Sequence, residues 1–269
     1  MQANFTSSLA SVDGAVMLAS RATIPATDEG LLRGDGAFEV IRLYDGRPFA
    51  LEEHLRRLER SAANLRLPVD LESVRADAWR LLAHAGTGPD HQLLRIVITR
   101  GGRRLLLTEP LPREPDQVRL GTITYSPTRI LDGVKSLSYA ANMLASRLAR
   151  ERGYDDALLV TPHGRVLEAP TSSIFWVADG SMFTPPLDEH ILASITRALV
   201  LDVTRATERP CTLDELLAAD EAFLASTTRE VEPISAIDER TFEAPGPLTR
   251  RAAQDVAERI RQRLADGDR

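Results

Sequence analysis

Apolar and polar positions alternate in two different ways along the chain. Residues 37–44 (AFEVIRLY) follow the period of two that is typical of a half-buried strand, and Asp45-Gly46 then predicts a hairpin turn. Residues 52–67 repeat apolar side chains at helical spacing, and Pro68 is expected to end that helix. Another helix is predicted at 71–85.

The rest of the chain mixes short strands and helices in the same way. The patterns predict strands at 93–99, 118–126, 156–161, 165–168, 173–177 and 221–225, and helices at 139–152, 194–207 and 248–264. Residues 108–116 contain three prolines, which favours a stiff connection. We therefore predict an α/β (α+β) fold of two lobes with a cleft between them: a smaller N-terminal domain (1–112), a Pro-rich linker (113–117) and a larger C-terminal domain (118–269).

Composition excludes several classes of function. Charged residues of both signs make up 27% of the chain and the net charge is −6, so a nucleic-acid partner is not expected. No apolar run reaches the roughly 18 residues of a membrane span, and the N-terminus lacks the pattern of a signal peptide. Cys211 is the single cysteine and the five histidines are scattered, so we expect no metal site. These observations favour a cytoplasmic protein.

Lys135 is the only lysine among the 33 lysine and arginine residues. Arginine replaces lysine well on a solvated surface, but its guanidinium does not lose its proton. A lysine amine, in contrast, can be deprotonated and can condense with a carbonyl. The residue is therefore either a residual surface lysine or a retained nucleophile, and the count alone does not decide between them.

Six stretches of sequence supply the context for this lysine. They are GDGAFEVIRLYDG (34–46), HLRRLERSA (54–62), VKSLSYAANMLA (134–145), GYDDALLVTPHGRVLEAPTSSIFWV (153–177), TPPLDEHILASITR (184–197) and DEAFLASTTREVEPISAID (220–238). In this order they resemble the class IV aminotransferases, the fold-type IV group of pyridoxal 5'-phosphate (PLP) enzymes. That group contains D-amino-acid and branched-chain aminotransferases and 4-amino-4-deoxychorismate lyases. The resemblance implies a two-domain fold-type IV enzyme whose larger domain binds PLP.

The resemblance also implies a role for individual residues. Lys135 stands where the family keeps the lysine that forms a Schiff base with PLP and then acts as general base. Glu168 matches the glutamate that keeps the pyridine nitrogen protonated. Residues at phosphate-binding or ring-binding positions are Arg57, Ile195, Thr196, Ser226, Thr227, Thr228, Thr171, Ser172 and Tyr139. Ser194 to Arg197 open a helix, whose N-terminus is suited to an anion.

The sequence indicates less clearly which subgroup of the class IV aminotransferases the chain resembles. Val40 stands where branched-chain enzymes usually have glycine, and residues 34–46 are more similar to the D-amino-acid type. Phe38 occupies the position of a tyrosine that helps those enzymes bind the substrate carboxylate. Other candidates for binding that carboxylate are Arg33, Arg100, Arg103 and Arg104, because guanidinium pairs bidentately with carboxylate.

Three activities therefore remain open at this point. We favour a transaminase that moves an amino group between a D-amino acid, or an (R)-primary amine, and a 2-oxo acid such as 2-oxoglutarate or pyruvate. The alternatives are 4-amino-4-deoxychorismate lyase, which makes 4-aminobenzoate and pyruvate, and a branched-chain L-amino-acid aminotransferase. A PLP-binding homologue without catalysis and a non-enzymatic binding domain stay as hypotheses of another class. The family resemblance implies a homodimer.

Overall fold

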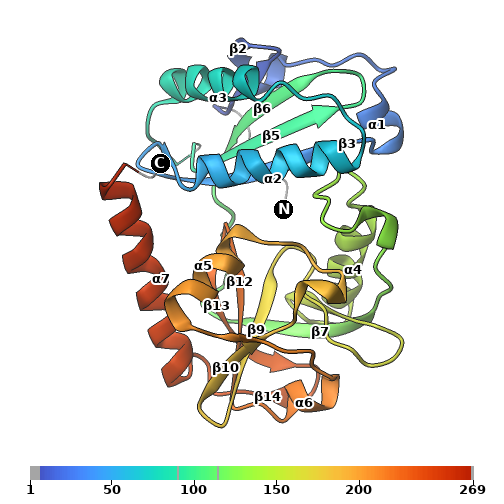
Figure 1. The fold of residues 1–269 in the computed structure, drawn as a ribbon, viewed down its shortest axis with the longest axis vertical. Helices are drawn as coiled ribbons and strands as arrows, with labels where there is room; N and C mark the ends of the chain where they lie inside the picture. The colour runs from blue at the N-terminus through green and yellow to red at the C-terminus, as the bar shows by residue number, and fades with distance from the viewer. Residues whose placement is uncertain (1–6, 90, 114, 268–269) are drawn as a thin grey trace. The chain divides into compact units, whose positions relative to one another are not determined.

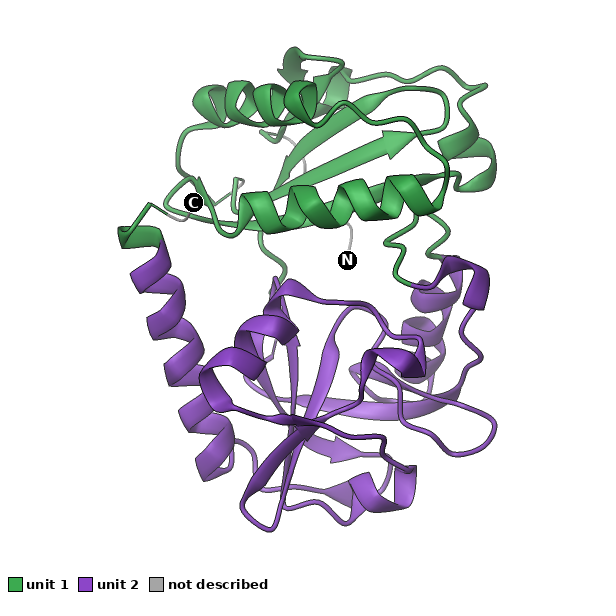
Figure 2. Cartoon of the chain, in the orientation of Figure 1, with its two compact units in different colours: residues 1–113, 133–139, 264–269 green, residues 114–132, 140–263 purple. Residues whose placement is uncertain are grey.

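The computed structural model of the protein describes residues 7–89, 91–113 and 115–267. The chain divides into two compact units (Figure 2). Unit 1 contains Met1–Arg113, Gly133–Tyr139 and Leu264–Arg269, and unit 2 contains Glu114–Asp132 and Ala140–Arg263. The segment that carries Lys135 thus belongs to unit 1, although the residues on either side of it belong to unit 2.

Unit 1 is an antiparallel sheet covered by two helices on one face (Figure 1). The strand order is β2-β1-β6-β5-β3-β4, and helices α2 and α3 pack on the sheet and against each other. Their bounds are β1 Leu9–Val12, β2 Ala15–Leu18, α1 Glu29–Arg33, β3 Gly36–Tyr44, β4 Arg47–Pro48, α2 Leu51–Asn64, α3 Leu71–Ala85, β5 Leu93–Thr99 and β6 Arg104–Glu109. The apolar stripes of the two helices bury Leu58 and Leu81 against Ile41 and Ile96, which forms one continuous core.

The helix predicted at 52–67 ends earlier than Pro68 would require. It ends at Asn64, and Arg66 follows with a φ of 55°. The backbone N–H of Leu67 donates to the carbonyl of Ala62, and that of Arg66 donates to Ala63. These two bonds form a Schellman motif, which satisfies the last helical carbonyls before the proline is reached.

Unit 2 is a mixed eight-stranded sheet with the order β11-β10-β9-β12-β13-β7-β8, and β14 pairs with β13. Helix α4 packs on β7 and β8, and α5 packs on β12 (Figure 1). The bounds are β7 Val118–Thr124, α4 Ala140–Glu151, β8 Asp156–Val160, β9 Ser173–Ala178, β10 Ser181–Thr184, α5 Ile195–Thr204, β11 Thr207–Glu208, α6 Leu213–Leu217, β12 Glu221–Ser226, β13 Glu230–Ile237, β14 Arg240–Thr241 and α7 Pro247–Ala265. A second core surrounds the buried Trp176 and Leu158.

One predicted strand is not a regular strand. Residues 165–168 make only single bridges, from Val166 to Val160 and from Arg165 to Thr212. The adjacent apolar residues Val166 and Leu167 are both buried, and backbone hydrogen bonds join the segment to residues 159–161 without forming a regular strand.

Candidate active site

In unit 1, the backbone of Lys135 is held between β3 and α2. Its carbonyl accepts a hydrogen bond from the N–H of Phe38 (3.0 Å), and its own N–H donates to Ser61 Oγ (3.1 Å). Two residues further on, the N–H of Leu137 donates to the carbonyl of Gly36 (2.9 Å). A Cβ on Gly36 would lie 2.6 Å from Leu137 Cδ1 and 2.4 Å from the carbonyl oxygen of Ile98, so this close approach requires glycine.

The side chain of Lys135 lies against two aromatic rings. Its Nζ is 4.4 Å from the centroid of the Phe38 ring and 5.5 Å from that of Tyr139. The two rings meet edge to face, with centroids 5.3 Å apart. Phe38 has no hydroxyl to donate to a carboxylate, and its ring instead orients the lysine amine.

A buried charged cluster surrounds Arg57 on the helix-covered side of the same sheet. Arg57 Nε and Nη2 donate to the two oxygens of Glu39, at 2.7 and 2.6 Å. His54 Nδ1 lies 2.7 Å from Glu39 Oε2. Glu39 is 0% exposed, His54 2% and Arg57 4%. The guanidinium is therefore fixed in one orientation by a partner that solvent does not reach.

The pKa values of this cluster follow from its burial and its charges. Burial by itself would raise the pKa of Glu39, but the charge and hydrogen bonds of Arg57, and then those of His54, hold that pKa at about 2. Burial lowers the pKa of His54, against the opposing effect of Glu39. At neutral pH, Glu39 is therefore a carboxylate and His54 is neutral. Because a carboxylate only accepts, Nδ1 of His54 carries the proton that it shares with Glu39.

In unit 2, Glu168 and Ser172 lie at the two ends of a tight turn. Glu168 is half-buried, and its Oε1 accepts a hydrogen bond from the N–H of Leu192 (3.2 Å). Burial, and then the negative charge of Glu168, raise the pKa of Tyr125. The turn is closed by bonds between the backbones of Ala169 and Ser172, and it leaves Thr171 exposed.

Two groups of hydroxyl and backbone donors belong to elements of unit 2 that pack together, α5 and β12. Ser194 caps α5 by accepting from the N–H of Arg197 (3.2 Å), and Thr196 in the first turn is buried. At the end of β12, Ser226 Oγ lies 3.4 Å from Thr228 Oγ1 in the turn that follows. A helix N-terminus and a turn rich in hydroxyls are each suited to a phosphate.

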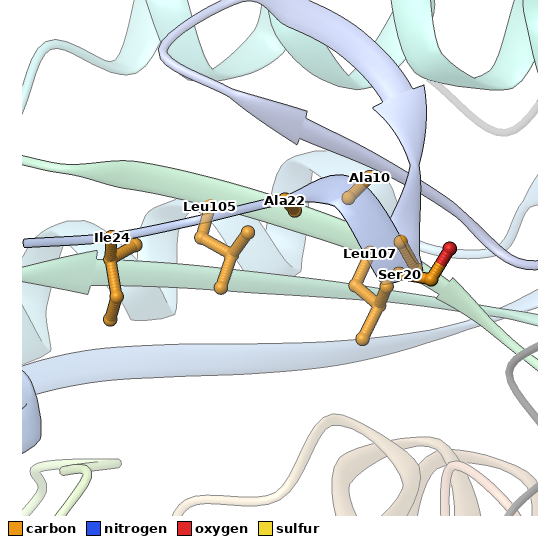
Figure 3. A pocket seen from close by; sticks show the side chains of 7 residues that line it. Ala10, Ser20, Ala22, Ile24, Leu105 and Leu107 are labelled. Carbon is orange, nitrogen blue, oxygen red and sulfur yellow. The ribbon is translucent and has the colours of Figure 1, made fainter.

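The pocket shown in Figure 3 has a different character. It has a volume of about 320 Å³ and lies in unit 1, on the side of the sheet away from α2 and α3, because Leu105 and Leu107 alternate with the buried Leu106. Of the seven described residues that line it, Ser20 alone has a polar side chain. A pocket lined in this way is unsuited to a phosphate or carboxylate.

Comparison with known proteins identifies the family. The Amino-transferase class IV profile matches residues 36–237, which is most of the chain. The chain belongs to the class IV aminotransferases. It is therefore an enzyme, and PLP is the cofactor of its class.

Similar proteins carry different names within this class. A protein of Methanocaldococcus jannaschii, provisionally named a branched-chain-amino-acid aminotransferase, is 31% identical over 91% of each chain. The D-alanine aminotransferase of Bacillus licheniformis is 31% identical over 88% of this chain and 92% of its own. A bifunctional aminodeoxychorismate lyase / D-amino acid transaminase of Mycobacterium tuberculosis is 30% identical, over 78% and 82%.

A solved structure supports the fold-type IV architecture. A hypothetical aminotransferase from Mycobacterium tuberculosis in its PLP-bound form aligns with a TM-score of 0.85 at 26% identity, covering 94% of this chain and 98% of that one. Other neighbours among the solved structures include a fold IV transaminase. The predicted fold class is confirmed.

One feature of this aminotransferase fits a bound cofactor directly. Ser172 Oγ is buried and has no hydrogen-bond partner among the described residues, and an unsatisfied buried hydroxyl is costly. A polar group of PLP would satisfy it. Together with the carboxylate of Glu168 and the hydroxyls of Thr196 and Ser226, this makes the residues present compatible with PLP. In the described part of the chain, no group of three or more His, Cys, Asp or Glu is placed to hold a metal ion.

The four arginines expected to bind a substrate carboxylate are each paired with an acid of unit 1. The partners are Glu29 for Arg33, Asp35 for Arg100, Asp13 for Arg103 and Asp77 for Arg104. Arg100 also donates to the carbonyls of Leu65 and Arg66, which ties it to the end of α2. Arg33 has the most exposed side chain of the four, at 73%.

No described helix has both the length and the apolar character that crossing a bilayer requires.

Glu39 is the residue that sequence reasoning missed. It shares the buried face of β3 with Ala37 and Ile41, so an acid stands where the alternation demands an apolar side chain. Such an acid needs a buried cation, and Arg57 on the adjacent helix is that cation. His54, on the same helix as Arg57, is likewise a packed, hydrogen-bonded core residue.

Proposed function

We propose that this class IV aminotransferase moves an amino group from a D-amino acid to a 2-oxo acid such as 2-oxoglutarate or pyruvate, with (R)-primary amines as further donors. The observation that carries the PLP assignment is the single lysine, whose backbone is fixed at two points and whose amine is held against Phe38 and Tyr139. The donor class is supported by the sequence of residues 34–46 and by D-alanine aminotransferases among the relatives.

Lys135 is proposed as the catalytic residue. PLP, when bound, supplies an aldehyde that condenses with amines and a ring that takes up the electrons of a broken Cα–H bond. Lys135 Nζ would hold the cofactor and, once released from it, would act as the base that moves the proton from the substrate Cα. The edge-to-face pair of Phe38 and Tyr139 lies against this amine.

The remaining roles divide between the ring and the phosphate of PLP. We propose that the Glu168 carboxylate keeps the pyridine nitrogen protonated, while Ser172 Oγ donates near the ring. The phosphate is bound by backbone N–H groups of Ile195 and Thr196 and by the hydroxyl of Thr227. Further proposed contacts are those of Arg57 with the phosphate, of Ser226 and Thr228 with the same group, and of Thr171 and Tyr139 with the ring.

Arg57 suits a fixed anion because its charge is permanent and its orientation is set. Glu39 engages Nε and Nη2, so the cation is aligned before any ligand arrives. For the substrate carboxylate we propose Arg33, since an exposed pair four residues apart, such as Arg33–Glu29, is weak and exchanges readily. We expect a cytoplasmic homodimer, in which Arg33 serves the site of the partner subunit.

A second candidate is 4-amino-4-deoxychorismate cleavage, because a relative carries both lyase and D-amino acid transaminase in its name. The two are separated by supplying the purified enzyme with D-alanine plus 2-oxoglutarate, with L-leucine plus 2-oxoglutarate, or with 4-amino-4-deoxychorismate. Glutamate formation from D-alanine alone supports the proposal. Release of 4-aminobenzoate without glutamate formation would replace it with the lyase, and glutamate formation from L-leucine alone would replace it with the branched-chain activity.

A further inference from the structure

Unit 2 contains a buried charged cluster that none of the proposed cofactor contacts uses. Arg229 directly follows Thr228, Glu232 lies on β13, and Asp156 is the first residue of β8. Their side chains are 7%, 4% and 3% exposed, respectively. Charged groups are seldom buried to this extent unless they are paired, and here Arg229 pairs with both acids.

The cluster joins three elements of the unit to the turn after β12. Arg229 Nη1 donates to Glu232, and Nη2 donates to Asp156 Oδ2 at 3.1 Å. The other oxygen of Asp156 accepts from Ser146 Oγ on α4 (2.7 Å) and from the N–H of Ala157 (2.9 Å). One guanidinium therefore links the turn directly to β13 and β8 and, through Asp156, to α4.

The hairpin that contains the turn has one residue in an uncommon backbone conformation. Ser226 pairs with Glu230 across the hairpin, so the loop consists of Thr227, Thr228 and Arg229. Glu230 has a φ of 55°, a left-handed conformation that is uncommon for a residue with a side chain. Ser226 Oγ also accepts from the N–H of Arg229 (3.3 Å). The Arg229 side chain thus anchors the loop from one end, next to its hydroxyl-bearing residues.

We propose that Arg229, with Glu232 and Asp156, is a positioning residue that holds Thr227 and Thr228 in the shape that binds the phosphate of PLP. The inference rests on the proposed role of these threonines. Two carboxylates engage the guanidinium, so it acts through the backbone of the turn and is not itself the cation that binds phosphate. Loosening the cluster weakens phosphate binding and leaves the contacts to the rest of the cofactor intact.

The test compares PLP with pyridoxal, which lacks the phosphate, in absorbance titrations of the enzyme after removal of its cofactor. Arg229→Lys keeps the charge and loses the two-pronged geometry. We expect it to weaken PLP binding about tenfold, the equivalent of one charge-assisted hydrogen bond, and to leave pyridoxal binding unchanged. Arg152→Lys is the matched control, because Arg152 pairs with Asp238 in the same unit at 3.1 Å and takes no part in the turn.

Glu232→Gln distinguishes a positioning role of Arg229 from direct ionic binding of the phosphate. It also provides a second test if Arg229→Lys does not fold. It frees the guanidinium of one carboxylate, so tighter PLP binding would show that Arg229 acts as a phosphate cation and would overturn the proposal. Weaker PLP binding with unchanged pyridoxal binding supports it. If both variants bind PLP as the natural protein does while Thr227→Ala weakens binding, the positioning role is wrong and the threonine assignment stands. If Thr227→Ala also has no effect on the preference for PLP over pyridoxal, the phosphate assignment itself is wrong.

Discussion

Replacing Glu39 with glutamine tests whether the buried cluster of unit 1 exists as described. The change preserves the shape of the side chain and one acceptor, but it removes the charge that faces Arg57 and places an N–H₂ against Arg57 or His54. A buried guanidinium without a counter-charge is strongly unfavourable, so we expect the free energy of unfolding to fall.

The pKa of Glu39 gives the size of the effect. Its ordinary value is 4.5 and its value in the folded protein is about 2, a difference that corresponds to about 3 kcal/mol. Because the folded pKa is the lower one, this contribution is present above pH 4.5 and is lost as the pH falls toward 2. The free energy of unfolding of the natural protein should therefore exceed that of Glu39→Gln by about 3 kcal/mol at pH 7, and by about half of that at pH 3.

Urea unfolding of the two proteins, followed by tryptophan fluorescence at several pH values between 7 and 3, measures this difference. Other carboxylates titrate over the same range, but they are common to both proteins and cancel. Glu59→Gln is the control, since Glu59 is exposed on α2, the helix that carries Arg57. Its replacement should change stability by less than about 0.5 kcal/mol. A difference for Glu39→Gln that is below about 1 kcal/mol at pH 7, or that does not narrow toward pH 3, would refute the reasoning.

Three further outcomes follow from the structure. Lys135→Ala should abolish transaminase activity and the covalent attachment of PLP after borohydride reduction; a labelled peptide elsewhere in the chain would contradict this. Glu168→Gln should retain PLP and lower kcat by about a hundredfold or more, because the pyridine nitrogen loses its carboxylate partner; turnover within a few-fold of natural would remove that role. Burial, and then the charge of Glu215, raise the pKa of Cys211 to about 12, so iodoacetamide at pH 8 should modify this thiol only after unfolding, and rapid modification of the native enzyme would show that it is not buried.

Local patterns predicted much of the fold. The helix at 71–85 and the strand at 93–99 have the predicted bounds, because a regular apolar repeat and an N-terminal cap at Asp70 define them locally. Strand β1 was not predicted, since its four residues are too few to show a period and it is held by pairing with β2 and β6. Such pairing depends on residues far along the chain.

The sequence predicted which residues belong to the candidate site, but not how those residues are buried or held in place. The resemblance of six stretches of sequence to the class IV aminotransferases indicated PLP, and it assigned roles to Lys135 and Glu168. The burial of Arg229 could not be predicted, since its partner Asp156 lies 73 residues away and a turn of polar residues normally faces solvent. The position of the lysine segment in unit 1 depends in the same way on long-range hydrogen bonds of the Lys135 backbone, with the N–H of Phe38 and with Ser61 Oγ.

The central claim is that this aminotransferase accepts D-amino acids. The most direct measurement mixes the purified, PLP-loaded enzyme with excess D-alanine, without any 2-oxo acid, and follows the absorbance of the cofactor. We predict that the visible band is lost as the amine form of the cofactor grows, and that L-alanine and L-leucine produce no such change. Conversion with L-leucine and none with D-alanine would contradict the claim and assign the enzyme to branched-chain L-amino acids.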